Sequence, residues 1–253
     1  MMEEIVESAL ALSRAGQWTR ALRLLDAYAG DSPASPEISL AAATVALDCD
    51  WFTGSSLAGS RLAALGDEGW DVAFQRLRHV YRQQLVTARP DDGELVAAAE
   101  ALCSSAPDGT RLGWAHMYRG LIADNVVGDR SAAVAHYERA MGTDDPLLTR
   151  EALRHLGDHD HDAGNNERAR ERWEEATALG AGAGAVLGTL SQQMLLAVLA
   201  RDEGDEAGAV ALAREIERWA GALGAKTIEA QATAFLAAVG TAVQSAVAAP
   251  SGR

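Results

Sequence analysis

Small and large apolar residues recur along this chain in a unit of 36 to 40 residues. Each readable unit has a glycine, an alanine five residues later and a larger or apolar residue four residues after that. The units carry Gly16, Ala21 and Leu25; Gly128, Ala133, Tyr137 and Ala140; Gly164, Ala169, Trp173 and Ala176; and Gly204, Ala209, Ala213 and Ile216. A repeat of this length predicts two helices that turn at the glycine and pack closely at the alanine.

This pattern resembles the tetratricopeptide repeat (TPR) family. The resemblance implies an all-α, right-handed α-solenoid of about six helix pairs plus a C-terminal capping helix, in one domain over 1–253. Clear repeats are expected at 1–35, with Pro33 at the repeat end, and at 110–146, 147–183 and 184–223. Degenerate repeats are expected at 36–109, where a globular helical insert is the alternative. The end of the chain, WAGALG and AKTIEAQATAFLAAVG, is also similar to repeat regions that close many actinobacterial regulators, which implies a sensor or scaffold part.

Several segments have more specific expectations. Residues 36–65 predict a helix, a turn at DCDWFTG and a second helix, and residues 68–106 predict a long helix, a turn at RPDDG and another helix. The run GAGAGAVLG at 180–188 is expected to be a flexible connection. The terminal helix, 226–249, has Ile228, Phe235, Val239, Val243 and Val247 along one side. We expect it either to cap the array or to mediate a homodimer.

Charge and cysteine content limit the kinds of partner. The formal net charge is -14 and Lys226 is the only lysine, so the electrostatic field repels nucleic acid and anionic lipid. Cys49 and Cys103 cannot form a disulfide framework. The N-terminus is acidic and no apolar run is long enough to span a bilayer. We therefore expect a cytoplasmic protein with neither nucleic-acid nor membrane partners.

The segment 151–163 concentrates histidine and aspartate. On a helix, His155, Asp158, His159 and Asp162 fall on the side opposite Leu153, Leu156, Gly157 and Asp160. Two imidazoles and two carboxylates at this spacing are candidate metal ligands, although a solvated polar face is the simpler interpretation. A metal- or small-molecule-responsive sensor around His155, Asp158, His159 and His161 is therefore the alternative function.

The resemblance also implies which residues face a concave groove. In the repeat at 147–183 these are Glu151, Arg154, Asp158, His161 and Asp162. The preceding repeat adds Tyr118, Ile122 and Asn125, and the following one adds Ser191, Met194, Val198, Arg201 and Asp202. This mixed, acidic set favours a partner with a basic or amphipathic segment. Of the three histidines, only His161 is expected to face the groove. His155 and His159 are expected toward the neighbouring edge of the same helix, which weakens a four-ligand metal site.

Catalytic motifs are not evident in the sequence. It contains no GxSxG, HExxH or GxGxxG, and no phosphate-binding glycine loop. We therefore expect a scaffold or adaptor that binds a protein or peptide, without enzymatic activity and without a cofactor.

Overall fold

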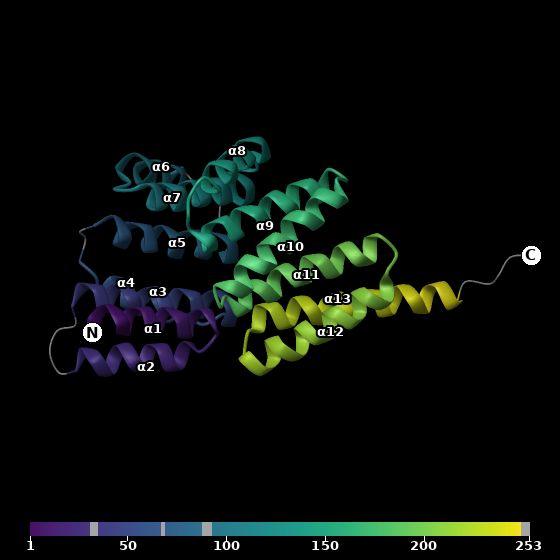
Figure 1. Cartoon of the computed structure of the whole chain (residues 1–253), viewed down its shortest axis with the longest axis horizontal. Helices are drawn as coiled ribbons and strands as arrows, with labels where there is room; N and C mark the ends of the chain where they lie inside the picture. Colours follow the sequence, from purple (N-terminus) through teal and green to yellow (C-terminus); the bar gives the residue numbers. More distant parts are fainter. Residues whose placement is uncertain (31–34, 67–68, 88–92, 249–253) are drawn as a thin grey trace, which may run out of the picture.

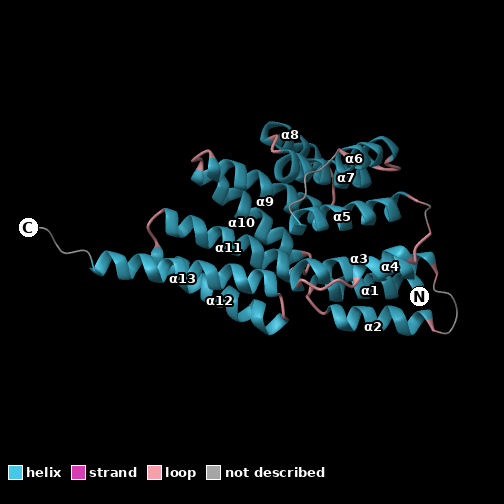
Figure 2. Ribbon diagram, turned by 180° about the vertical axis from the view of Figure 1, so that it is seen from behind, coloured by secondary structure: helices cyan, strands magenta, loops and turns pink. Residues whose placement is uncertain are grey.

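The computed structural model describes residues 1–30, 35–66, 69–87 and 93–248, and from residue 240 onward it describes the helix but not the side chains. Within these residues the chain forms thirteen α-helices, one five-residue π-helical turn and no strand (Figures 1 and 2). The all-helical prediction is therefore confirmed. The elements are α1 (Met2–Arg14), α2 (Trp18–Ala29), α3 (Pro36–Thr53), α4 (Ala58–Ala63), α5 (Trp70–Thr87), α6 (Glu94–Ser105), α7 (Gly109–Ile122), η1 (Ala123–Val127), α8 (Arg130–Ala140), α9 (Pro146–Asp162), α10 (Asn166–Gly182), α11 (Val186–Asp202), α12 (Glu206–Leu223) and α13 (Lys226–Ala248).

The helices pack in two layers. Each even-numbered helix packs on the odd-numbered helices that precede and follow it. The odd-numbered helices also pack on one another, with α1 on α3, α3 on α5, α5 on α7, α7 on α9 and α11 on α13. Sequential helices are thus spatial neighbours, which is the packing that tandem helix pairs need to bury their apolar faces.

The two ends of the chain also meet. Helix α3 packs on α13 and α1 packs on α11, and one hydrophobic cluster joins residues 9–45 to residues 187–239. In Figure 1, α13 begins beside the end of α3. There the Thr227 hydroxyl donates to the backbone oxygens of Trp51 and Phe52 at 3.1 Å each. An open array, in which each repeat contacts only its neighbours, does not make these contacts.

The repeat residues occupy the positions that their spacing predicts. Gly16, Gly128, Gly164 and Gly204 have φ of 76°, 81°, 78° and 91°, a conformation that favours glycine. The alanines and larger residues that follow them are at most 1% exposed: Ala21, Leu25, Ala133, Tyr137, Ala140, Ala169, Trp173, Ala176, Ala209, Ala213 and Ile216. The recurring sequence pattern therefore marks the residues that pack between helices.

One close contact sets the distance between α9 and α10. A Cβ atom on Gly157 would lie 2.4 Å from Nε1 of Trp173, which is closer than real Cβ contacts allow. The Trp173 indole is 1% exposed and donates a 3.0 Å hydrogen bond to the backbone oxygen of Arg154. The preceding pair repeats the arrangement, since a Cβ on Gly120 would lie 2.5 Å from the Tyr137 ring.

The turn predicted at DCDWFTG is wrong for most of its length. Helix α3 continues through this segment to Thr53, and the chain turns only at Gly54, with φ of 75°. Asp50 explains the difference: it is fully buried within α3, and its carboxylate accepts hydrogen bonds from the backbone N–H of Leu57 (2.7 Å) and Ala58 (2.9 Å). A residue that looked like a turn former therefore holds the start of α4 while remaining helical.

The flexible connection predicted at 180–188 is also wrong. Helix α10 extends to Gly182 and α11 begins at Val186, so only three residues connect them. The glycines serve close packing instead. A Cβ on Gly188 would lie 1.8 Å from Nη1 of Arg150, and one on Gly180 would lie 3.0 Å from Cδ of the same side chain. Arg150 needs this space because it is buried between these helices.

Other expected helices differ only in their boundaries. Helix α9 begins before residue 151, because Asp145 caps it by accepting from the backbone N–H of Leu147 at 2.9 Å and Pro146 occupies its first turn. In α13, Ile228, Phe235 and Val239 are buried, whereas the side chains of Val243 and Val247 lie outside the described residues. Pro33 and the RPDD part of the predicted RPDDG turn also lie outside them. Among the described helices, none has the length and apolar character needed to cross a bilayer.

Gly157→Ala should destabilise the protein by about 1–3 kcal/mol, because the new methyl group overlaps the Trp173 ring. The control is Gly182→Ala at the end of α10, where a Cβ meets nothing within 4 Å. This control should be neutral or stabilising by about 0.5–1 kcal/mol. Urea unfolding measures both. Equal effects would contradict a close packing requirement at Gly157.

Candidate functional site

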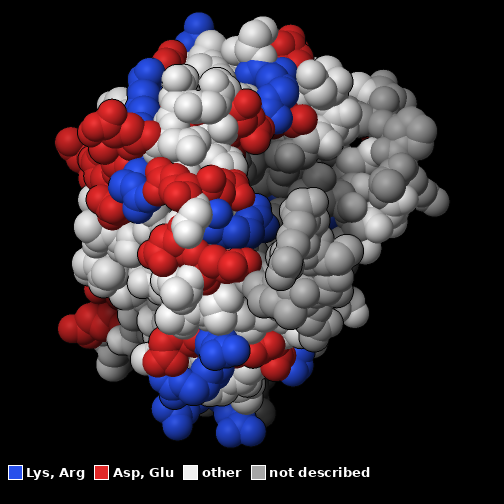
Figure 3. Space-filling model, turned by 90° about the vertical axis from the view of Figure 1, so that its right-hand side faces the viewer, with Lys and Arg blue, Asp and Glu red and all other residues white. Residues whose placement is uncertain are grey.

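Polar residues gather where the odd-numbered helices end. The C-terminal ends of α5, η1, α9 and α11 form a surface that we call the odd-helix rim. It includes the sequence-predicted residues Asn125, Arg154, Asp158, His161, Asp162, Arg201 and Asp202, together with Asp124, all of which are at least partly exposed. Figure 3, seen from the right-hand side of Figure 1, shows acidic and basic side chains interleaved across that end of the molecule. The rim is therefore a mixed-charge surface.

Charged contacts connect two repeats of the rim. Nε2 of His161 on α9 lies 3.1 Å from Oδ2 of Asp202 on α11. Arg201 donates to Oδ1 of Asp202 through Nε (2.9 Å) and Nη2 (2.8 Å). The Arg201 guanidinium also lies 5.2 Å from the centre of the Phe235 ring, within cation–π range. The structure thus brings together three of the predicted residues, and it adds Phe235 from α13.

Asp158 is the least satisfied group of the rim. Its Oδ2 lies 3.8 Å from Nη1 of Arg154 and 3.7 Å from Nδ1 of His155, beyond hydrogen-bond length. Its Oδ1 is buried and accepts no hydrogen bond, although the side chain as a whole is 32% exposed. Burial raises the pKa of Asp158, Arg154 opposes this shift and Asp162 adds to it. The site therefore holds an acceptor without a matching donor.

Four predicted groove residues do not offer an open surface. One of them, Ile122, is 1% exposed and lies in a hydrophobic cluster with Tyr118. Tyr118 is 8% exposed and packs edge-on against Phe74 and Tyr81, and Met194 is 7% exposed in the cluster that joins the chain ends. Glu151 is partly buried and forms an ion pair with Arg150. Helix α5 therefore covers Tyr118, whereas closure of the chain ends covers Met194.

The four candidate metal ligands turn toward different partners. His155 stacks on Tyr137 with ring centres 5.1 Å apart, and Nε2 of His159 lies 2.9 Å from Oδ2 of Asp124. Asp162 pairs with Arg130 at 2.6 Å. Over the described ranges, no group of three or more His, Cys, Asp and Glu side chains is arranged to hold a metal ion. The helical spacing therefore did not determine where these side chains point.

A partly buried polar network links four odd-numbered helices. Arg78 on α5 donates to Asp48 on α3 (2.9 Å), to the Tyr118 hydroxyl on α7 (3.1 Å) and to Gln75 (2.8 Å). Ser13 on α1 donates to the other oxygen of Asp48 at 3.1 Å. Sequence analysis missed this network, because its members lie in four different repeats and share no motif. Its geometry favours a structural role, since its donors and acceptors are matched.

The sequence analysis also did not identify Trp51 as a candidate surface residue. Trp51 is 39% exposed and stacks on Tyr81 with ring centres 6.2 Å apart. The Tyr81 hydroxyl accepts a 3.0 Å hydrogen bond from Nδ2 of Asn125. Trp51 thereby extends the rim to α3. The sequence did show this tryptophan, but its assignment to a turn hid its position on a helix face.

Two histidines form a second cluster, between α7 and α8. Nδ1 of His116 lies 3.1 Å from Nδ1 of His136, their rings stack with centres 5.2 Å apart, and Cys103 lies 3.8 Å from His116. Burial, followed by the charge of Arg119, lowers the pKa of His136 to about 4. Burial and Arg139 also lower the pKa of His116. Both rings are therefore neutral at pH 7.

The fold and the rim define a class: an all-helical protein of layered helix pairs with a partly buried, mixed-charge surface at the ends of its odd-numbered helices. No family model, curated protein or solved structure matches the chain. The relation to tetratricopeptide repeats therefore depends on the sequence pattern.

Acid should weaken the fold through the histidine pair. The folded-state pKa of His136 lies below the ordinary value of 6.5, so the unfolded chain binds more protons between about pH 6.5 and 4. The stability that neutral, buried His136 contributes is fully present above pH 6.5, and it decreases as the pH falls toward 4. His136→Asn removes this titration and should show a smaller decrease in stability over that range, measured by urea unfolding at several pH values. Parallel profiles for the variant and the wild type would contradict the assignment.

Proposed function

We propose that this protein is a cytoplasmic TPR-like scaffold whose odd-helix rim binds a protein or peptide segment. The repeat pattern, the buried positions of the repeat residues and the two-layer packing support a solenoid of helix pairs. The contacts of α1 and α3 with α11 and α13 make it an array whose ends close on one another. In this proposal the rim, rather than an open concave groove, is the binding surface.

The observation that carries the proposal is the partly exposed carboxylate of Asp158. Its side chain is 32% exposed, and its Oδ2 lies 3.8 Å from Nη1 of Arg154 and 3.7 Å from Nδ1 of His155, beyond hydrogen-bond length. Burial of the rest of the group raises the pKa of Asp158, because burial disfavours its charged form. An N–H group of a partner that donates to Oδ2 therefore stabilises a carboxylate that its own neighbours stabilise only weakly.

The chemistry of the rim favours a basic partner segment with an aromatic residue. Asp158, Asp162 and Asp202 supply negative charge, in a chain whose net charge is -14. Arginine on the partner could pair with these carboxylates in a bidentate geometry. Trp51, with an exposed fraction of 39%, offers an aromatic face for cation–π or stacking contacts. Binding requires no chemical step and no cofactor. The homodimer expected through α13 remains a prediction that light scattering can measure.

Short labelled peptides test the proposal by fluorescence anisotropy. One peptide combines arginine or lysine with an aromatic residue, a second replaces the basic residues with glutamate, and a third replaces the aromatic residue with alanine. The first should bind most tightly, and Asp158→Asn should weaken its binding on the order of tenfold, because a charge-assisted hydrogen bond is lost.

The matched control is Glu174→Gln, which removes the same charge from an exposed position on α10. It should leave the affinity nearly unchanged. Equal losses in the two variants would mean that only net charge matters. Equal binding of the basic and acidic peptides would rule out the rim as a receptor for basic segments.

A further inference from the structure

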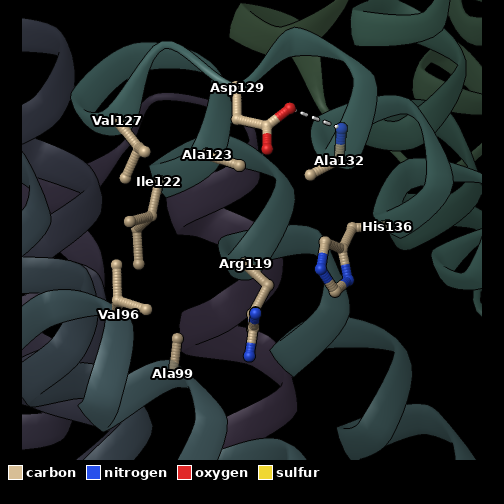
Figure 4. Close-up of a pocket in the computed structure, with 9 residues that line it drawn as sticks. All are labelled: Val96, Ala99, Arg119, Ile122, Ala123, Val127, Asp129, Ala132 and His136. Carbon is tan, nitrogen blue, oxygen red and sulfur yellow. Dashed lines mark hydrogen bonds between the residues drawn. The ribbon is translucent and has the colours of Figure 1, made fainter.

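A small cavity lies between α6, α7 and α8, and η1 forms part of its wall. Its volume is about 140 Å³. Figure 4 shows how its residues surround it: apolar side chains form one side, Arg119 and His136 lie at the opposite side, and Asp129 lies at its upper end. The lining residues are Val96, Ala99, Arg119, Ile122, Ala123, Val127, Asp129, Ala132 and His136.

The cationic side of the cavity can accept an anion. Arg119 has five N–H donors, and its Nη1 atom pairs with Glu100 at 2.7 Å. Glu100 is 55% exposed and lies outside the cavity lining, so this pair is a weak surface contact that leaves other donors of Arg119 for a ligand. His136 engages Nδ1 with His116, which makes Nε2 the ring atom that can contact a ligand.

The charge state of the histidines strengthens this arrangement. Burial, and after it the charges of Arg119 and Arg139, lowers the pKa of both rings and keeps them neutral. A neutral imidazole can donate one hydrogen bond without competing with Arg119 for counterions.

The backbone at the cavity wall is irregular. Ala123 and Val127 are the two ends of η1, the π-helical turn that follows α7. Turns of this kind are rare and occur often at functional sites, because the extra residue widens the helix. Here the widened turn forms part of the cavity wall, and the backbone N–H of Asp129 closes it by donating to the backbone oxygen of Ala123 at 2.9 Å.

We propose that this cavity binds a small carboxylate with a short aliphatic chain. The carboxylate contacts Arg119 and Nε2 of His136, and the chain lies against Val96, Ala99, Ile122 and Val127. The size is appropriate, since an apolar protein cavity of roughly 150 Å³ can hold benzene, which has six non-hydrogen atoms. The cavity differs from the partner surface proposed above in its lining residues, although both sites include residues of η1.

Pentanoate is a suitable probe, and isothermal titration calorimetry at pH 7 measures its binding to the full chain. We expect saturable binding of pentanoate, with 1-pentanol and pentylamine binding at least about tenfold more weakly, because neither supplies an anion for Arg119. Arg119→Gln should weaken pentanoate binding by a similar factor. Saturable binding that does not depend on the carboxylate, or no saturable binding at all, would overturn the proposal.

The matched control is Arg218→Gln, which removes the same charge from an exposed arginine on α12 that pairs with Glu215. It should leave pentanoate binding unchanged. An equal loss in this variant and in Arg119→Gln would mean that only net charge matters, against the proposal.

A filling substitution tests the location in a second way. Ala132 is half-buried on the cavity wall, so Ala132→Leu should occupy the space and abolish pentanoate binding while Arg119 remains (Figure 4). Circular dichroism checks that each variant folds. Unchanged binding in a folded Ala132→Leu variant would contradict the site, even where Arg119→Gln fails to fold.

Discussion

The contact between a glycine on one helix and an aromatic ring on the next sets the geometry on which this fold depends. Gly157 admits the Trp173 indole, and Gly120 admits the Tyr137 ring, each at a distance that a methyl group would block. The ring then fills the space between the paired helices and reaches back to a backbone oxygen or a carboxylate, as Trp173 does with Arg154 and Tyr137 with Asp124. A small residue and a large one therefore act together: one permits close approach, and the other makes it favourable.

Closure of the chain ends determines which polar residues are buried and which remain at the surface. Because α1 and α3 pack on α11 and α13, the faces of the odd-numbered helices become interior, and the polar residues on them must find partners within the protein. Arg78 does so with Asp48 and Tyr118. At the helix ends this coverage stops, so the Asp158 side chain stays 32% exposed, with its Oδ2 3.8 Å from Nη1 of Arg154. The same packing thus explains why the contacts of Arg78 are internal and the Asp158 carboxylate reaches the surface.

Residues whose role is local were predictable from the sequence, and residues whose role depends on distant contacts were not. The turn glycines and the alanines after them follow from spacing within one helix pair, and they occupy the predicted positions. Tyr118 and Met194 were expected at an open groove, but α5 buries Tyr118 and the cluster that joins the chain ends buries Met194. The error at Asp50 has a similar origin: its partners, seven and eight residues along the chain, keep an apparent turn former inside a helix. The directions of His155, His159 and Asp162 likewise depend on Tyr137, Asp124 and Arg130, which belong to the preceding repeat unit.

The π-helical turn η1 belongs to both proposed sites. Asp124 and Asn125 contact His159 and Tyr81 on the rim side, whereas Ala123 and Val127 line the cavity. Five consecutive residues with one shared backbone therefore connect a surface for a partner to a cavity for a small ligand. A ligand affects the rim only if it binds one arrangement of this turn more tightly than another. The structure supplies the physical link that such an effect needs, because any change in the winding of η1 moves Asp124 and the cavity wall together.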